Sequence, residues 1–353
     1  MHDENHYMNM GQYFGFIFVF AYIVASTLAQ DDSSNSSVVI SCPTGPDVSS
    51  YDFNLHLISL FVVLATSSSG ALIPVIVKRL PQLKTPYAVF FIIKHFGTGI
   101  ILATAFVHML PSAFTSLLCV NSLSDYDAWP GVITMNSAVF IFFIEYAAVN
   151  YVDNNNTKND NLITANNNET PDDHSENQNL EVIGGSTLLS SDAQIIGIII
   201  LEIGICFHSV IIGMALSVST GSNFISLWVA LVFHQMFEGL GLGSRIAELN
   251  YPENSIKPWL MSCAYGLTTP IGIAMGLGVH ESYNPASQTA LIVQGTLDSL
   301  SAGILIYSAL VELMANDFIY DPQFRKSPKI KQLGAFICLL FGISFMALIG
   351  RWT

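Results

Sequence analysis

Long uninterrupted apolar blocks constrain this chain more than any other feature of its sequence. A helix of about 20 residues spans the hydrocarbon core of a bilayer, which is roughly 30 Å thick. Such a segment must be helical, because in lipid only a helix satisfies its backbone hydrogen bonds internally. We therefore predict an all-α polytopic membrane protein with eight transmembrane helices. The blocks are Leu55 to Val77, Tyr87 to Leu110, Gly131 to Tyr151, Ala193 to Val218, Phe224 to Gly243, Pro258 to Gly278, Thr289 to Glu312 and Gln332 to Gly350.

The composition agrees with a chain embedded in a lipid bilayer and excludes one class of function. Only 11% of the 353 residues are charged, whereas about 25% are charged in an average soluble domain. The charges comprise 26 acidic residues and 12 basic ones. Nucleic-acid binding requires clustered Lys and Arg, so we expect no nucleic-acid partner.

The amino-terminal residues 1–29 have the features of a signal peptide. An apolar block from Phe14 to Ala25 is followed by small residues that suit cleavage. Asp3 and Glu4 stand where a signal peptide usually carries basic residues, so an uncleaved ninth helix is the alternative.

The rest of the chain divides into membrane and water-exposed segments. Residues 30–54 are expected to form an extracytoplasmic segment, in which Asn35 begins a glycosylation sequon. Residues 152–192 are rich in Asn and acidic residues, with too little apolar surface to offset the entropy of ordering, so we predict a disordered cytosolic loop. This loop separates the first three helices, within 55–151, from the last five, within 193–353.

Basic residues predict the orientation of the helices, because cytoplasmic loops are enriched in Lys and Arg. Bases occur in the loops after the first, third, fifth and seventh helices and are absent from the even-numbered loops. Both mature termini are then extracytoplasmic. A signal peptide fits the cell surface and the endomembrane system, and of these we expect the plasma membrane for this multi-pass protein.

Two of the five cysteines are predicted to face the oxidising side of the membrane. Cys42 precedes the first helix and Cys119 lies in the second loop, whereas the other three are inside helices. We expect a disulfide between Cys42 and Cys119. The alternative is a pair of free or separately buried thiols.

Ionisable residues inside the helices indicate a functional site, because each costs several kcal/mol in a membrane. Donor atoms from four helices are expected at one depth, and His234 and Glu238 share one helix face at i and i+4. Two imidazoles with carboxylates and neutral oxygens suit a divalent transition metal. The alternative is that each histidine is an ordinary packed residue. Residues near mid-helix are His208, His234, Thr268, Thr269, Asp298 and Ser301.

Two of these helices resemble the paired signatures of the ZIP (Zrt/Irt-like) metal transporters, in the branch typical of plants and fungi. The resemblance extends from about residue 55 to 353. The motifs are Glu202-Ile-Gly-Ile-Cys-Phe-His208-Ser209-Val-Ile-Ile-Gly213 and His234-Gln235-Met-Phe-Glu238-Gly239, supported by Phe106-Val-His108-Met-Leu-Pro111, Thr268-Thr269-Pro270, and Ser301-Ala302-Gly303 with Glu312.

The resemblance implies an eight-helix carrier that moves Zn2+, or in some members Fe2+ or Mn2+, into the cytosol by alternating access. These ions would be cargo rather than cofactors, and a homodimer is compatible with family analogy. Relatives with two metals have a carboxylate one turn after the first histidine, where this chain has Ile212. This favours one tight site with a weaker neighbour. The implied ligands are His208, His234 and Glu238, with Ser209, Gln235 and Thr269 near the second position.

The implied route begins at His108 and ends past Glu202 and Glu312, with Asp298 and Ser301 along it. Glycines at positions 213, 239, 241 and 303 would permit close helix packing. An intramembrane metal-dependent hydrolase is the alternative class of protein. The sequence offers neither a His-Glu-x-x-His pair nor an obvious separate general base, so we expect no enzyme.

Overall fold

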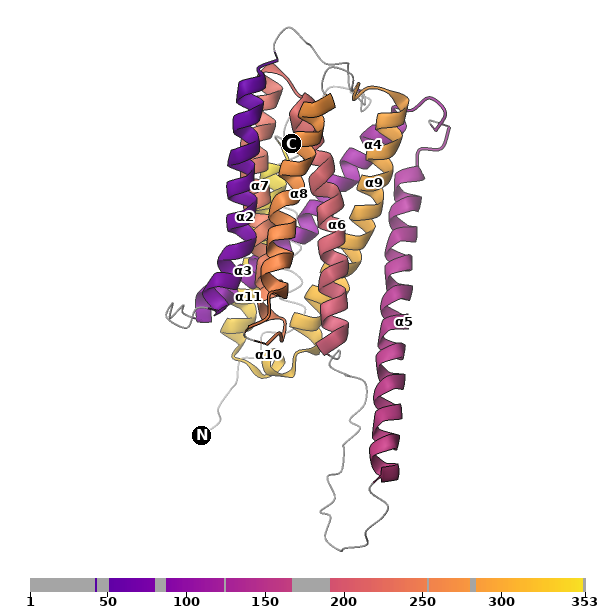
Figure 1. Ribbon diagram of the computed structural model, residues 1–353, viewed down its shortest axis with the longest axis vertical. Helices are drawn as coiled ribbons and strands as arrows, with labels where there is room; N and C mark the ends of the chain where they lie inside the picture. Colours follow the sequence, from indigo (N-terminus) through magenta and orange to yellow (C-terminus); the bar gives the residue numbers. More distant parts are fainter. Residues whose placement is uncertain are drawn as a thin grey trace, which may run out of the picture. The chain divides into compact units, whose positions relative to one another are not determined.

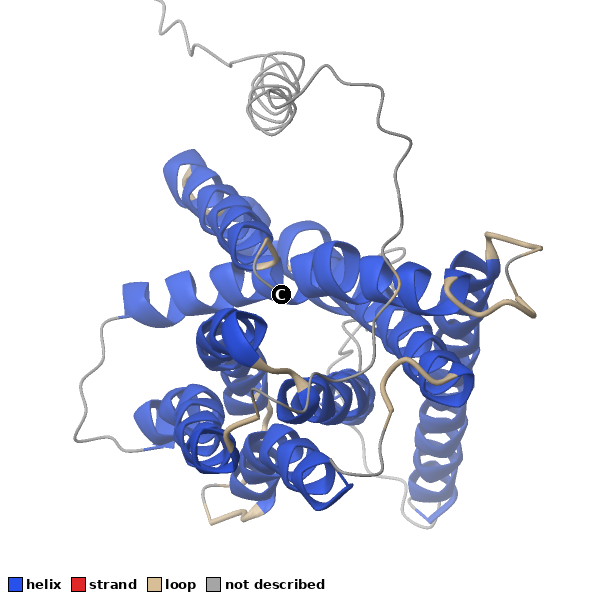
Figure 2. Ribbon diagram, turned by 90° about the horizontal axis from the view of Figure 1, so that it is seen from above, coloured by secondary structure: helices blue, strands red, loops and turns tan. Residues whose placement is uncertain are grey.

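The computed structural model describes residues 42, 51–79, 87–123, 125–166, 191–252, 254–279 and 284–351. Every regular element in that part of the chain is a helix (Figure 2). The expected signal peptide, the sequon at Asn35 and most of the expected 30–54 segment lie outside the described residues.

Eight helical spans in the described part of the chain are long and apolar enough to cross a membrane, which confirms the predicted number. Consecutive spans run in opposite directions, so α2 begins at the same end of the helical bundle as α11 finishes (Figure 1). The spans comprise α2 (Phe53–Arg79), α3 (Tyr87–Ala103) continued by η2 (Thr104–Met109) and α4 (Leu110–Leu118), α5 (Trp129–Asn166), α6 (Ser191–Val218), α7 (Gly221–Glu248), α8 (Lys257–Val279), α9 (Gln288–Tyr307) continued by η3 (Ser308–Tyr320) and α10 (Pro322–Lys326), and α11 (Lys329–Ile349).

Two spans contain π-helical segments, η2 and η3. A π-helix has wider turns than an α-helix and therefore changes the direction in which the following side chains point; such segments are frequent at functional sites. His108 lies in η2 and Glu312 lies in η3. Both residues were expected on the transport route, but the sequence pattern did not predict the π-helical geometry.

Helix α5 is longer than the sequence predicted. We expected disorder from residue 152, whereas α5 remains helical to Asn166 and projects past the other helices (Figure 1). Only its first part, Trp129–Ala148, is apolar enough to span a membrane. The physical reason is cooperativity, because extending a formed helix avoids the cost of nucleating a new one. The prediction of disorder was therefore wrong for residues 152–166.

The spans pack in two groups. Helix α2 lies against α7 and α8, and α8 lies against α6, which makes α2, α6, α7 and α8 the first group. In the second group α3 packs on α11, while α9 packs on α4 and α5. The groups meet mainly where α3 contacts α7 and where α6 contacts α9. This boundary positions the polar side chains that concern function.

Glycines allow the helices to approach closely at that boundary and within each group. A Cβ atom at Gly241 of α7 would lie 3.0 Å from the Cα atom of Gly97 on α3, closer than ordinary packing allows. Gly213, Gly239 and Gly303 each lie similarly close to another helix. The expectation that these four glycines permit close packing is confirmed.

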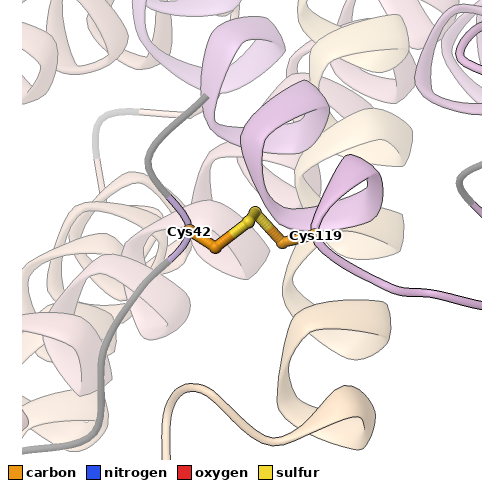
Figure 3. The surroundings of a disulfide bond; sticks show 2 residues. All are labelled: Cys42 and Cys119. Atoms are coloured by element: carbon orange, nitrogen blue, oxygen red, sulfur yellow. A yellow bond between two sulfur atoms is a disulfide. The ribbon is translucent and has the colours of Figure 1, made fainter. Parts of the chain in front are cut away.

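A disulfide joins Cys42 to Cys119, the residue directly after α4 (Figure 3). The two Cα atoms are 5.5 Å apart, within the usual range for disulfides. The bond ties the chain ahead of α2, a helix of the first group, to the end of α4 in the second. The other three cysteines are thiols.

Candidate metal centre

Helices α6 and α7 bring two histidines together in the interior of the bundle. His208 on α6 is 2% exposed and His234 on α7 is fully buried. Their ring centroids lie 5.9 Å apart. The two residues were predicted to lie at one depth, and they are neighbours in the structure.

A third imidazole comes from the π-helix η2. The ring centroid of His108 lies 5.1 Å from that of His208 and 5.2 Å from that of His234. We expected His108 on the route by which an ion enters, ahead of the site. The structure instead places its ring beside the other two, so three imidazoles converge from η2, α6 and α7.

Two carboxylates border this histidine cluster. Glu238, one turn after His234 on α7, is fully buried, and its Oε2 lies 3.5 Å from Nε2 of His234. Asp298 on α9 is 1% exposed, and its Oδ1 lies 3.3 Å from Nδ1 of His208. The cluster therefore takes side chains from both packing groups, from α6 and α7 in the first and from η2 and α9 in the second.

Neutral oxygen and amide groups lie next to the histidines. The side-chain amide of Gln235 donates a hydrogen bond to the hydroxyl of Thr269 on α8 and another, 3.4 Å long, to that of Ser209 on α6. The hydroxyl of Tyr265 donates to the backbone carbonyl of Gln235 at 2.7 Å and so helps to hold this part of α7. Of the three residues expected near a second metal position, Gln235 thus contacts both of the others.

Several ligand atoms in the centre are buried without a hydrogen-bond partner among the described residues. They are Nε2 of His208, both ring nitrogens of His234, both carboxylate oxygens of Glu238 and Oε1 of Gln235. A buried polar atom left unpaired costs about 1–3 kcal/mol, and more if it is charged. So many unpaired atoms in one place indicate a site built for a bound group.

The side chains of the centre are not already arranged around an ion. No three His, Cys, Asp or Glu side chains among the described residues meet in the geometry of a metal site. Zinc binds imidazole nitrogen at about 2.0–2.1 Å, and ring separations of 5.1 to 5.9 Å allow one ion between rotated rings. The side chains would therefore have to turn toward a common point to bind.

The remaining residues expected on the route lie on either side of the centre. Ser301 is buried one turn after Asp298 on α9. Glu202 precedes His208 on α6 by about 9 Å, at 1.5 Å per residue, and is 9% exposed. The carboxylate of Glu312 packs against Gly197 on α6, and its oxygens have no hydrogen-bond partner among the described residues. Two buried carboxylates thus line α6 toward its amino-terminal end.

A second polar cluster lies where the ends of α7 and η3 meet α3. We call Lys94, Arg245, Glu248 and Asp317 the ion-pair network. Lys94 lies 2.9 Å from Glu248 and 3.0 Å from Asp317. Arg245 donates two hydrogen bonds to the carboxylate of Asp317, at 3.1 and 2.7 Å, and a third to the hydroxyl of Thr98.

The sequence reasoning missed this network. The apolar block that ends at Gly243 leaves Arg245 among the bases of a loop expected to be cytoplasmic, and Asp317 lies beyond the block that ends at Glu312. Both helices continue past those points. The sequence did carry a signal, because Arg245 follows one apolar block and Asp317 follows another, each within a few residues of the block's end. A search for opposite charges at the ends of different blocks would have found this pair.

Comparison with known proteins gives consistent matches over most of the chain. A family model described as ZIP zinc transporter matches residues 53–350. Zinc-regulated transporter 1 of Saccharomyces cerevisiae is 37% identical over 336 residues, covering 86% of this chain and 89% of that protein. Zinc transporter 3 of Arabidopsis thaliana is 35% identical over 294 residues, covering 82% of each. Zinc-regulated transporter 2 of Saccharomyces cerevisiae is 32% identical and covers 85% of this chain and 94% of its own length.

Proposed function

This chain belongs to the family of ZIP zinc transporters, and from that premise we propose that it carries Zn2+ across the membrane through the centre formed by α6, α7 and η2. The family consists of transporters, so the alternative of a metal-dependent hydrolase has no support among the relatives. Zinc is the cargo, and the protein is a divalent metal transporter rather than an enzyme.

The observation that carries the proposal is the set of unpaired ligand atoms on His208, His234 and Glu238. Imidazole nitrogen and carboxylate oxygen are common zinc ligands. An ion bound between them would satisfy atoms that the protein leaves buried and unpaired. We assign these three residues as the primary ligands.

Gln235, Ser209 and Thr269 form a weaker neighbouring position. Their groups are neutral and hydrogen-bonded to one another, apart from Oε1 of Gln235. Ile212 lies one turn after His208 and supplies no carboxylate. A single tight position beside a weaker one suits a carrier, because a closed site of strong ligands would hold the ion too firmly to release it.

The route passes through the centre, where His108 lies beside His208 and His234, and then along Glu202 and Glu312. Bases concentrated in the odd-numbered loops favour a cytoplasmic location for the amino-terminal end of α6, so transport runs into the cytosol. The same rule places both mature termini outside, and we assign the protein to the plasma membrane. Fe2+ and Mn2+ are the other candidate cargoes, since imidazole and carboxylate bind both.

Uptake of radiolabelled zinc in cells expressing the chain tests the assignment. His234→Ala and Glu238→Ala should each reduce the initial rate at least tenfold at unchanged surface expression. Asn136→Ala is the control, because Asn136 is also a polar residue within a span, but its amide donates, in the contacts seen here, to the carbonyl of Val132 in its own helix. Wild-type rates in both alanine variants would refute the site, and competition by unlabelled iron and manganese would rank the cargoes.

A further inference from the structure

Asp298 contacts His208 from the other packing group. Its Oδ1 lies 3.3 Å from Nδ1 of His208, and both side chains are 2% exposed. Its second oxygen, Oδ2, accepts a hydrogen bond of 2.7 Å from the hydroxyl of Ser112 on α4. Gln294, one turn before Asp298 on α9, donates to that hydroxyl at 3.4 Å. Both oxygens of the carboxylate are therefore engaged by neighbouring side chains.

The two nitrogens of His208 have different surroundings. Nδ1 faces the Asp298 carboxylate, whereas Nε2 is buried and has no hydrogen-bond partner among the described residues. A neutral imidazole has one nitrogen that donates and one that accepts. A carboxylate can only accept, so it favours the tautomer with the proton on Nδ1, which leaves the lone pair on Nε2 for a metal.

We infer that Asp298 is a positioning residue, which fixes the tautomer and the ring orientation of His208 so that Nε2 is the metal-binding atom. Ser112, supported by Gln294, holds the carboxylate in place. A carboxylate behind a metal-binding histidine is a recurring arrangement that raises ligand basicity. This inference rests on the proposed function, because it concerns a ligand of the same centre.

The contact also couples metal binding to the packing of the two helix groups. His208 belongs to α6 in the first group, whereas Asp298 and Gln294 on α9 and Ser112 on α4 belong to the second. The ring of His208 is therefore oriented only while α6 and α9 are packed as they are here. Separation of these helices would release the ring and weaken the hold on an ion.

The test compares Asp298→Asn with Asp298→Ala in zinc uptake at several zinc concentrations. Asparagine retains an oxygen that accepts from Nδ1 of His208, but it is a poor zinc ligand. The alanine variant should raise the KM for zinc by about 10- to 100-fold, the usual cost of losing a partner of a metal ligand. The asparagine variant should restore the KM to within a few fold of wild type. If asparagine is as damaging as alanine, Asp298 acts through its charge or as a direct ligand, and the inference is wrong.

Two further variants separate positioning from folding. Ser299→Ala is the matched control on α9, because this buried hydroxyl bonds only within its own helix in the contacts seen here, to the carbonyl of Gly295; its KM should equal that of wild type. Ser112→Ala should raise the KM less than Asp298→Ala does. The double variant should have the same KM as Asp298→Ala alone, because the two residues act through one interaction. Additive effects would contradict a shared role. Failure of the proposed function is distinguishable, since Glu238→Ala would then transport zinc normally whatever the Asp298 variants do.

Discussion

The metal centre and the ion-pair network are both polar and both lie where the two helix groups meet, yet they differ in how their atoms are paired. The network is buried at Arg245 and Asp317 but partly exposed at Lys94 and Glu248. In the network every charged side chain has an oppositely charged group within 4 Å, and Arg245 donates two hydrogen bonds to the carboxylate of Asp317. In the centre Glu238 has no Lys or Arg partner among the described residues. Neither of its oxygens has a hydrogen-bond partner there, and Oε2 lies 3.5 Å from Nε2 of His234, itself an expected ligand.

The difference indicates two purposes for buried polar groups in one bundle. A paired network balances its own charges, and removing one member leaves an uncompensated charge, which is strongly destabilising. An unpaired set is incomplete without a ligand and is retained for binding. We therefore expect the network to respond to mutation through stability and the centre to respond through zinc. The following experiments test that distinction on purified protein in detergent.

The largest expected effect is on stability, in the network. Asp317→Ala leaves Arg245 buried without its main partner and should lower the free energy of unfolding by about 3–5 kcal/mol. Thermal unfolding without zinc measures the loss. The control is Asp321→Asn, which removes a negative charge from the same span but keeps the side-chain oxygen that caps α10 by accepting from the N–H of Gln323. It should change little, because Asn and Asp cap helices about equally well. Equal stability of wild type and Asp317→Ala would contradict a structural role for the network.

The second effect is stabilisation of the wild-type protein by zinc. A ligand that binds only the folded state at 100 times its Kd stabilises by about 2.7 kcal/mol, so zinc should raise the unfolding temperature. Glu238→Gln should abolish this rise while leaving the stability of the zinc-free protein at or above that of wild type, since it removes an unpaired buried charge. If Glu238→Gln unfolds as readily as Asp317→Ala, the two regions do not differ as proposed.

The smallest effect is expected at the partly exposed member of the network. The side chain of Lys94 is 23% exposed, and solvent weakens the contribution of such ion pairs to about 1 kcal/mol or less. Lys94→Met keeps the aliphatic stem and should lower stability by no more than that, with zinc stabilisation intact. A loss as large as that of Asp317→Ala would mean that Lys94, rather than Arg245, compensates Asp317.

The sequence predicted the eight spans and the face shared by His234 and Glu238, because length and helical spacing are local properties. It did not predict that His108 joins the centre, since the direction of its ring depends on the π-helix η2, for which the sequence carries no simple pattern. It also ended two helices too early, at Gly243 and Glu312. Hydropathy falls where charges begin, but charges that pair with each other can stay buried.

Helix α5 also continues past the end of its apolar block, although the residues that follow the block are polar rather than paired charges. The segment after residue 151 looks unfavourable for order by composition, yet α5 remains helical to Asn166. Composition describes the cost of ordering an isolated segment, whereas a neighbouring transmembrane helix supplies the nucleus. The tertiary contact between Asp298 and His208 could not be predicted at all, because it joins helices whose relative rotation only packing determines.

The disulfide between Cys42 and Cys119 sets an upper limit on movement rather than a fixed distance. Cys42 lies eleven residues before Phe53, the start of α2, and an extended chain of that length reaches about 36–40 Å. The bond therefore sets a covalent limit on how far the start of α2, in the first group, can lie from the end of α4, in the second. While the bond is intact, any movement of one group relative to the other must keep the start of α2 and the end of α4 within that distance.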